Sequence, residues 1–131
     1  MLPKRILSIF VFAGVMLTFC GCTPSLVGSE AGAYSSGKLY AVTSRDMNTV
    51  YQAALNALGY LEIETTETAK DFFYARVVAK GADGKTITIR IKPGEGELTK
   101  FSIKVGTVGD KHRSQVIYEQ IRQNLGINTA K

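Results

Sequence analysis

The stretch Lys85–Lys92, KTITIRIK, alternates strictly between polar and apolar residues. Ile87, Ile89 and Ile91 fall on one face of an extended chain, while threonines and basic residues fall on the other. Clean alternation with a period of two predicts a strand that has one buried face and one wet face. The stretch therefore predicts a sheet that is covered on a single side.

Further runs around this stretch alternate in the same way, at residues 60–66, 72–80 and 98–105. Within 72–80, the side chains expected on the buried face are those of Phe73, Ala75, Val77 and Ala79. Segments rich in Gly, at 81–84 and 93–97, separate the runs and predict turns, so consecutive hairpins make an antiparallel meander. A shorter alternating run, KLYAVT at 38–43, predicts one more strand.

Two amphipathic helices are expected, one before the meander and one after it. The first has Ser44 as its N-cap and Gly59 as its end, with an apolar stripe of Met47, Val50, Tyr51, Ala54, Leu55 and Leu58. Asp110 and Gly126 bound the second, whose stripe is Val116, Ile117, Ile121 and Leu125. The order β-α-β-β-β-β-α predicts an α+β fold, an antiparallel sheet of about five strands with two helices packed on one face.

The N-terminus has the three-part pattern of an export signal. Lys4 and Arg5 precede an apolar run, Ile6–Phe19, and small Gly21 precedes Cys22. The alternative is a transmembrane helix, but a span needs about 20 apolar residues, and this run is shorter. We therefore expect residues 1–21 to be a cleaved signal peptide.

The junction Phe19-Cys20-Gly21-Cys22 resembles a bacterial lipoprotein cleavage box with Cys22 as the lipid acceptor. Gly21 is small, as such boxes require, whereas bulky Phe19 precedes Cys20. The resemblance implies a diacylglycerol on Cys22, and two acyl chains give stable attachment without a spanning helix. Thr23 follows the acceptor where an aspartate would favour inner-membrane retention, which implies the periplasmic face of the outer membrane.

The rest of the chain divides into three segments. Residues 22–37 are rich in Gly and Ser and are expected to form the lipidated N-terminus and a flexible tether, with a recognition segment as the alternative. Residues 38–126 are expected to form one small α+β domain, and 127–131 a frayed tail. Without Lys4 and Arg5, the 16 basic residues become 14 against 11 acidic, a net charge of +3. Such a mild excess is not a nucleic-acid-binding signature.

The run Ile103–Asp110, IKVGTVGD, is followed by Ser114, Ile117 and Ile121 in the expected helix. Together with the strand after the Asp-Gly turn and the helix at 51–58, it resembles a family of small bacterial membrane-anchored lipoproteins of unknown function. The resemblance covers most of the mature chain, including the Gly-x-x-Gly-Asp loop before the last helix. It implies no assigned activity and no catalytic residues.

Candidate catalytic and metal-binding residues are few. His112 is the only histidine, and Gln115 and Val116, three and four residues on, are not the partners that a metal site needs. Asp110, His112 and Ser114 crowd into one helical turn, where side chains two residues apart point in different directions. A catalytic triad needs converging side chains, so we expect no enzyme, cofactor or metal site here.

Two turns have weaker alternative interpretations. Residues 106–110 could cradle an anion before a helix, although Asp110 as the helix cap explains that residue. Glu95, Glu97 and Asp83 could hold calcium, but scattered carboxylates without a ligand-rich loop are more typical of solvated turns.

The wet face of the sheet is expected to carry Arg76, Lys80, Arg90, Lys92 and Lys104, beside Glu62 and Glu64. One interpretation is a solvated face with cross-strand ion pairs. The other is a contact surface for anionic envelope components, such as lipid head groups or an acidic protein. Aromatic residues beside positive charge are typical of interfaces, so the candidate interaction surface is Phe72, Tyr74, Arg76, Arg90 and Lys104.

The expected function is that of a non-enzymatic binding or structural module in the bacterial envelope, with an envelope protein or polymer as partner and no nucleic acid. The alternative is a periplasmic small-ligand carrier or an accessory of an envelope enzyme. A deep cavity between helices and sheet would favour the carrier.

Overall fold

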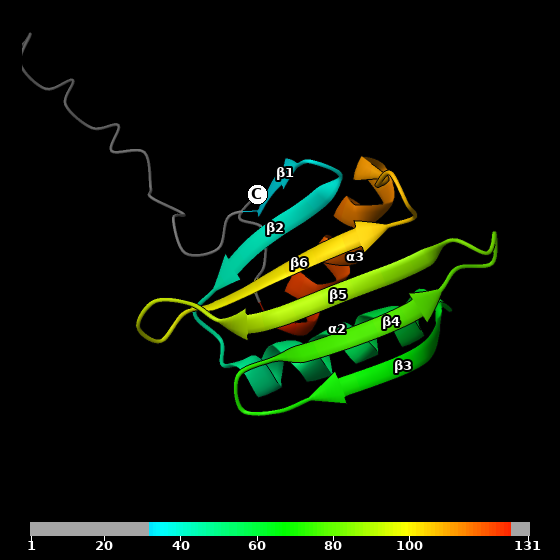
Figure 1. Ribbon diagram of the computed structural model, residues 1–131. Coiled ribbons are helices and arrows are strands. Elements are labelled where there is room, and N and C mark those ends of the chain that lie inside the picture. The colour runs from blue at the N-terminus through cyan, green and yellow to red at the C-terminus, as the bar shows by residue number, and fades with distance from the viewer. Residues whose placement is uncertain (1–31, 127–131) are drawn as a thin grey trace, which may run out of the picture.

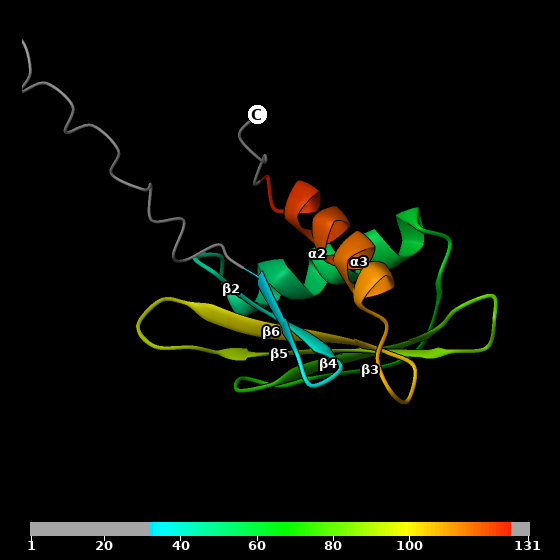
Figure 2. The same ribbon diagram turned by 90° about the horizontal axis from the view of Figure 1, so that it is seen from above.

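The computed structural model describes residues 32–126, which form a six-stranded antiparallel sheet with two helices (Figure 1). Figure 2 shows both helices on the same side of the sheet, so the predicted α+β fold is confirmed, with one strand more than expected. The strand order is β1-β2-β6-β5-β4-β3. In chain order the elements are β1 Gly32–Ser35, β2 Lys38–Thr43, α2 Met47–Tyr60, β3 Glu64–Lys70, β4 Ala75–Lys80, β5 Thr86–Pro93, β6 Thr99–Val105 and α3 Lys111–Asn124.

The core lies between the sheet and the helices, and β5 and β6 run through its middle. Ile87, Ile89 and Ile91 of β5 are fully buried, as their alternation predicts. Ile89 is paired on one side with Val77 of β4 and on the other with Ile103 of β6. Because these neighbours are also fully buried, they form a continuous apolar row across the sheet.

The two helices cover this row with different side chains. Helix α2 packs on β4 and β5 with a face of small residues and two larger ones, namely Val50, Ala53, Ala54, Ala57 and Leu58. Helix α3 packs on β6 and β2, and it also contacts α2. Its buried residues are Ser114, Ile117, Tyr118 and Ile121. Val116, which was expected in the apolar stripe of α3, is instead exposed.

The caps of α3 are as predicted, whereas both ends of α2 differ from the prediction. Asp46, not Ser44, is the N-cap of α2, and its carboxylate accepts from the backbone N–H of Thr49 at 3.1 Å. Hydrogen bonds from the Thr49 side chain and backbone hold the pKa of Asp46 below its usual value. Gly59 lies inside α2, which continues to Tyr60, because the left-handed residue that ends the helical path is Glu62, with a φ of 59°.

Because α2 ends later than predicted, the strand that follows it also begins later than predicted. β3 occupies 64–70 rather than 60–66, and Leu61 and Ile63 lie in the connection, where they pack against the core. The backbone N–H of Ile63 donates to the carbonyl of Leu58 at 2.8 Å, the six-to-one hydrogen bond that closes a helix after a left-handed residue.

The hairpin between β3 and β4 corrects a second boundary. β4 begins at Ala75 rather than at 72, and the Phe73 side chain, predicted to be buried, is 81% exposed. The reason is a tight turn in which Asp71 N–H donates to the Tyr74 carbonyl at 2.8 Å. The Asp71 carboxylate accepts from the N–H of Phe73, also at 2.8 Å. Asp favours such turns because its side chain bonds to the backbone two residues on.

Strand β1 lies in the segment predicted to be a flexible tether, so that prediction is wrong for residues 32–37. Gly32–Ser35 pairs antiparallel with β2 through a two-residue loop, Ser36-Gly37. Both loop residues have positive φ, 51° and 79°, as a type I′ hairpin turn requires. The proposed acceptor Cys22, the signal peptide 1–21, the remaining tether 22–31 and the tail 127–131 lie outside the described residues.

One buried polar group stands out in the core. The Ser114 hydroxyl is buried under α3, and no residue of the described 32–126 segment forms a hydrogen bond with it. A buried hydroxyl without a partner costs about 1–3 kcal/mol, and alanine is the better helix former. We therefore expect Ser114→Ala to raise the free energy of unfolding by about 1 kcal/mol in urea titrations. Ser102→Ala, on the solvated side of the sheet, is the control, and a destabilised Ser114→Ala would contradict the prediction.

Candidate functional site

The face of the sheet that the helices leave uncovered, called the open face below, is strongly basic. Its middle strands β2, β5 and β6 present Lys38, Arg90, Lys92, Lys100 and Lys104, and none of the residues of these strands is acidic. Three ion pairs are present in residues 32–126, Arg76–Glu67, Arg113–Asp83 and Arg122–Glu119. None of them neutralises the five middle cations, so the centre of the open face carries uncompensated positive charge.

The strand register places like charges directly opposite each other on this face. Lys92 of β5 is paired with Lys100 of β6, and Arg76 of β4 is paired with Arg90 of β5. Like charges at opposed positions destabilise a sheet. Glu67 compensates Arg76, whereas no carboxylate of the described segment compensates the lysine pair. The arrangement costs stability, and no contact among the described residues offsets the repulsion of the lysine pair.

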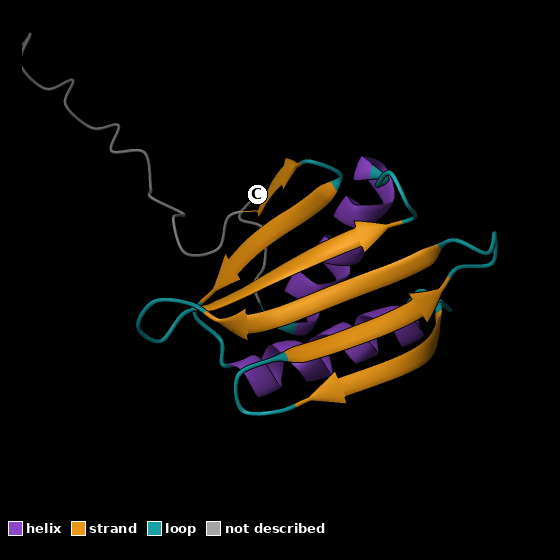
Figure 3. Ribbon diagram, in the orientation of Figure 1, coloured by secondary structure: helices purple, strands orange, loops and turns teal. Residues whose placement is uncertain are grey.

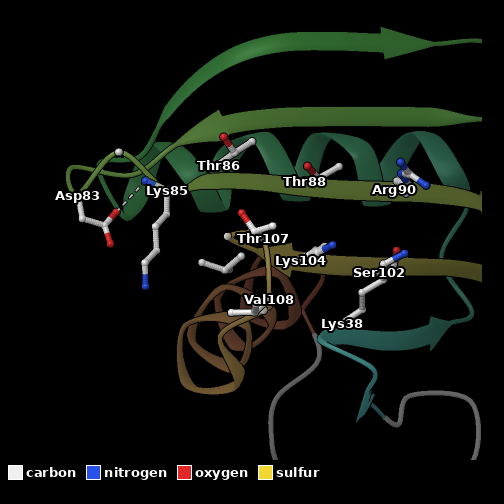
Figure 4. A pocket seen from close by; sticks show the side chains of 14 residues that line it. Lys38, Asp83, Lys85, Thr86, Thr88, Arg90, Ser102, Lys104, Thr107 and Val108 are labelled. Atoms are coloured by element: carbon white, nitrogen blue, oxygen red, sulfur yellow. Dashed lines mark hydrogen bonds between the residues drawn. The ribbon is translucent and has the colours of Figure 1, made fainter.

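A concavity of about 620 Å³ lies at one end of the open face and is called the first concavity (Figure 4). Its floor combines cations and hydroxyl groups from adjacent strands, namely Thr86, Thr88, Arg90, Ser102 and Lys104, with Lys38 at the start of β2. The turns at 83–85 and 106–109 form its walls. Charged donors beside hydroxyl donors suit a phosphate or a carboxylate group.

The one carboxylate on the rim of the first concavity is already engaged. Asp83 accepts from the Arg113 guanidinium of α3 at 2.6 Å and from the backbone N–H of Lys85 at 3.2 Å. The Lys85 hydrogen bond is the main reason why the pKa of Asp83 lies below its usual value. Because Arg113 pairs with this carboxylate, Asp83 does not neutralise the lysines of the floor.

Two glycines hold in place the wall formed by the turn at 106–109. Gly37, in the β1–β2 turn, and Gly109, just before α3, approach so closely that a Cβ on Gly109 would lie 2.3 Å from the Gly37 carbonyl oxygen. Their φ angles, 79° and 94°, lie in the region that favours glycine. Asp110 follows and caps α3, accepting from the Arg113 N–H at 3.0 Å. The IKVGTVGD run thus supplies a strand, a wall of the concavity and a helix cap.

A second concavity, of about 570 Å³, lies on the open face toward the β5–β6 loop. Lys92, Lys100 and Arg90 line it together with the aromatic rings of Tyr40 and Tyr74. The two concavities share Lys38, Arg90 and Ser102 but differ in character. Further cations and hydroxyl groups complete the lining of the first, and cations and aromatic rings complete that of the second.

The structure brings together some of the residues predicted from the sequence and separates others. Arg90 and Lys104 line the first concavity, and Tyr74 and Arg90 the second. Arg76 lies on the same face but is paired with Glu67, and Phe72 lies at the tip of the β3–β4 hairpin, outside both lining sets. Glu62, expected on the wet face, is in the turn after α2.

Sequence analysis missed the contribution of β2 to this site. Lys38 and Tyr40 join it because β2 pairs with β6 rather than with β3. The alternation KLYAVT places both side chains on one face, but it does not say which strand lies beside them.

The residues weighed for catalysis do not converge. His112 is exposed on the first turn of α3, the Ser114 side chain is buried, and Asp110 is occupied as the helix cap. Between Gly32 and Gly126, no group of three or more His, Cys, Asp or Glu side chains could hold a metal ion. No helix in the same range is long and apolar enough to cross a membrane. Both concavities lie on the open face, and apolar side chains fill the layer between sheet and helices.

The pair Lys92–Lys100 allows a test of how much opposed like charges destabilise the sheet. We expect Lys92→Glu to raise the free energy of unfolding by about 0.5 kcal/mol at low salt, because a repulsive pair with Lys100 becomes attractive. The gain should shrink in about 1 M salt, where the Debye length is about 3 Å. Lys92→Gln, which only removes the repulsion, should give a smaller gain, and a loss of stability in Lys92→Glu would contradict the argument. Urea denaturation at two ionic strengths measures both.

Comparison with known proteins shows that the chain matches a protein family. The family model described as a protein of unknown function (DUF3568) matches residues 5–124. A search of curated proteins found no match. The matched region takes in both helices as far as Asn124, all six strands and the IKVGTVGD run on which the sequence resemblance rests.

Proposed function

The chain belongs to the DUF3568 family of proteins of unknown function, and we propose that it is a non-enzymatic binding module that holds an anionic partner on its open face. One observation carries the proposal. Five cations lie unneutralised on three adjacent strands that contain no acidic residue, and two of them, Lys92 and Lys100, face each other directly. An anionic partner would remove the repulsion that the free protein retains.

The first concavity supplies the chemistry for such a partner. Lys38, Arg90 and Lys104 offer charged donors, and the neighbouring threonine and serine hydroxyls offer neutral ones. This combination suits phosphate or carboxylate groups, which form short charge-assisted hydrogen bonds with Lys and Arg. Small-molecule sites bury most of their ligand, whereas this concavity lies on the surface of the sheet (Figure 4). It therefore favours anionic groups displayed on a polymer or a surface over an enclosed small ligand.

The setting that we propose is the bacterial envelope, with a lipid on Cys22 as the anchor and the domain on the periplasmic face of the outer membrane. Support comes from the basic start, the apolar run Ile6–Phe19 and the small Gly21 before Cys22. The proposal that the module is not an enzyme is supported by the separation of Asp110, His112 and Ser114 described above.

The anchor predicts a simple outcome. Cys22→Ala should remove the protein from the membrane fraction and leave an unlipidated species, which incorporates no label when cells are grown with a radioactive fatty acid. Cys20→Ala is the matched control and should keep the label, because Cys20 leaves with the signal peptide. Unchanged labelling of Cys22→Ala would contradict the assignment.

The open face is tested with inorganic polyphosphate as an anionic probe. We expect Arg90→Glu combined with Lys104→Glu to abolish binding that the unaltered protein shows at low salt, as measured by titration calorimetry. Arg45→Glu combined with Lys111→Glu changes the net charge equally at exposed positions outside both concavities. This control should retain most of the binding. Equal losses in the two double variants would mean that only net charge matters, and would overturn the proposed site.

A further inference from the structure

The two most exposed aromatic residues of the described domain stand side by side. Phe72 and Phe73 are 91% and 81% exposed at the tip of the β3–β4 hairpin, which is called the aromatic tip below. The turn that presents them is ordered by hydrogen bonds, from Asp71 N–H to the Tyr74 carbonyl and from Phe73 N–H to the Asp71 carboxylate. Exposing two adjacent phenylalanines to water is unfavourable, and the packing of the core does not explain why a structured turn holds them there.

The surroundings of the aromatic tip are basic and aromatic. Tyr74, the next residue, lines the second concavity with Lys92 and Lys100. The register Ala75–Ile91–Phe101 places the start of β4 beside the ends of β5 and β6 that carry these lysines. In Figure 1 the β3–β4 hairpin and the β5–β6 loop lie at the same end of the sheet. A convex apolar tip is thus continuous with the aromatic and cationic part of the open face.

We propose that the aromatic tip inserts into the interface of an anionic lipid bilayer, while Lys92 and Lys100 contact its head groups. This inference deepens the proposed function, on which it rests for the anchor and for the anionic partner. Phenylalanine is among the residues that interfacial segments bury at the boundary between head groups and acyl chains, and each basic residue near an anionic surface adds about 1 kcal/mol of attraction. The tip supplies the apolar part of such a contact and the lysines supply the electrostatic part.

The length of the N-terminal segment supports a bilayer as the occupant. Ten residue steps separate Cys22 from Gly32, the first residue of β1. A chain of this length spans at most about 36 Å, while a helix of 14 residues such as α2 is about 21 Å long. A lipid on Cys22 would therefore keep the domain within about two of its own helix lengths of the membrane, close enough for the aromatic tip to reach the lipid.

The chain contains no tryptophan, so one introduced indole reports on a single surface position. Phe72→Trp places it on the aromatic tip, and Tyr60→Trp places it at another exposed site, 73%, at the end of α2 and outside both concavities. This end of α2 leads into β3 at the end of the sheet opposite the aromatic tip (Figure 3). The full-length chain is reconstituted with vesicles of phosphatidylcholine, with or without phosphatidylglycerol, so that its N-terminal segment holds both variants at the lipid.

In vesicles that contain phosphatidylglycerol, we expect the emission of Phe72→Trp to shift to shorter wavelength and to be quenched by brominated lipids. Tyr60→Trp should keep the emission of an indole in water. Without phosphatidylglycerol, or with Lys92→Glu and Lys100→Glu added, the quenching of Phe72→Trp should weaken. Unshifted and unquenched emission from Phe72→Trp, or equal quenching at both positions, would overturn the inference. A shift that appears with envelope protein but not with lipid would overturn it in favour of a protein partner.

The same preparations separate this inference from the proposed function. Polyphosphate binding by Phe72→Trp, measured without lipid, reports on the open face alone. If the tip stays in water while polyphosphate binds and Arg90→Glu with Lys104→Glu abolishes that binding, membrane insertion is wrong and the proposed function stands. If the tip is quenched by lipid while that double variant binds polyphosphate normally, the tip inserts and the first concavity is not the anionic site.

Discussion

Gly109→Ala is expected to lower the free energy of unfolding by about 2–4 kcal/mol. An alanine at a φ of 94° adopts a backbone conformation that costs about 1–3 kcal/mol for residues with a side chain. Its Cβ would also lie 2.3 Å from the Gly37 carbonyl oxygen and 2.6 Å from the Gly37 Cα. Because both obstacles are backbone atoms, no rotamer change relieves the overlap, and the β1–β2 turn must move. Urea denaturation followed by circular dichroism measures the loss.

Gly96→Ala is the matched control for this prediction. Gly96, in the β5–β6 loop, also has a positive φ, 61°, but a Cβ there meets no atom within 4 Å. Gly96→Ala should therefore lower the free energy of unfolding by about 1 kcal/mol, the strain of the left-handed conformation alone. If Gly96→Ala and Gly109→Ala were equally destabilised, the contact between the two turns would contribute nothing. Gly109→Ala should also weaken polyphosphate binding, because the displaced turn is a wall of the first concavity.

The parts of the fold that could be predicted from the sequence are those with local, repeated signals. The alternation in β5 and β6 identified both strands and their buried faces, and Asp110 and Gly126 bounded α3 correctly. Errors arose where a few residues decide the local backbone. The pair Ser36-Gly37 has the composition of a tether, yet its two positive φ values make a hairpin. The Asp71 side chain accepts from the Phe73 N–H in the turn before β4, and this turn leaves the Phe73 side chain in solvent.

The candidate site was predictable in its chemistry and not in its boundaries. Alternation alone placed Arg90 and Lys104 on the wet face, and that placement is confirmed. The pairing of β2 with β6, which adds Lys38 and Tyr40, joins residues some sixty positions apart, as in the register Tyr40–Ser102. This pairing joins strands that α2, β3, β4 and β5 separate in the chain, and no short stretch of sequence records it.

The two faces of the sheet differ in composition, and this separation explains why a small domain can carry so much unpaired charge. All the apolar strand residues that fill the core lie on the covered face. The described domain has 95 residues, Gly32 to Gly126, and at about 0.05–0.15 kcal/mol per residue such a domain has roughly 5–14 kcal/mol of stability. Repulsion between Lys92 and Lys100 takes only a small part of it. The open face is therefore free to be shaped by binding.

Ile89→Ala, on the covered face, should lower the free energy of unfolding by about 3–4 kcal/mol. Ile89 is fully buried between Val77 and Ile103 in the centre of the sheet. Truncating such a side chain costs 2–5 kcal/mol, because the lost burial is joined by a cavity that the neighbours fill only in part. The central strands are held on both sides, so they have little room to collapse into the space. Thermal and urea denaturation should both report the loss.

Two neighbouring substitutions make this prediction specific to the covered face. Ile89→Val removes one methylene and should cost about 1 kcal/mol. Thr88→Ala, one residue away but on the open face, should stay within about 0.5 kcal/mol, since Thr88 lines the first concavity and not the core. A large loss in Thr88→Ala would mean that the open face also supports the fold, and its cations could no longer be assigned to binding. A small loss in both Ile89 variants would mean that the central row is not the core that the burial pattern indicates. If Ile89→Ala is destabilised and Thr88→Ala is not, charge reversals on the open face test binding without a confounding loss of structure.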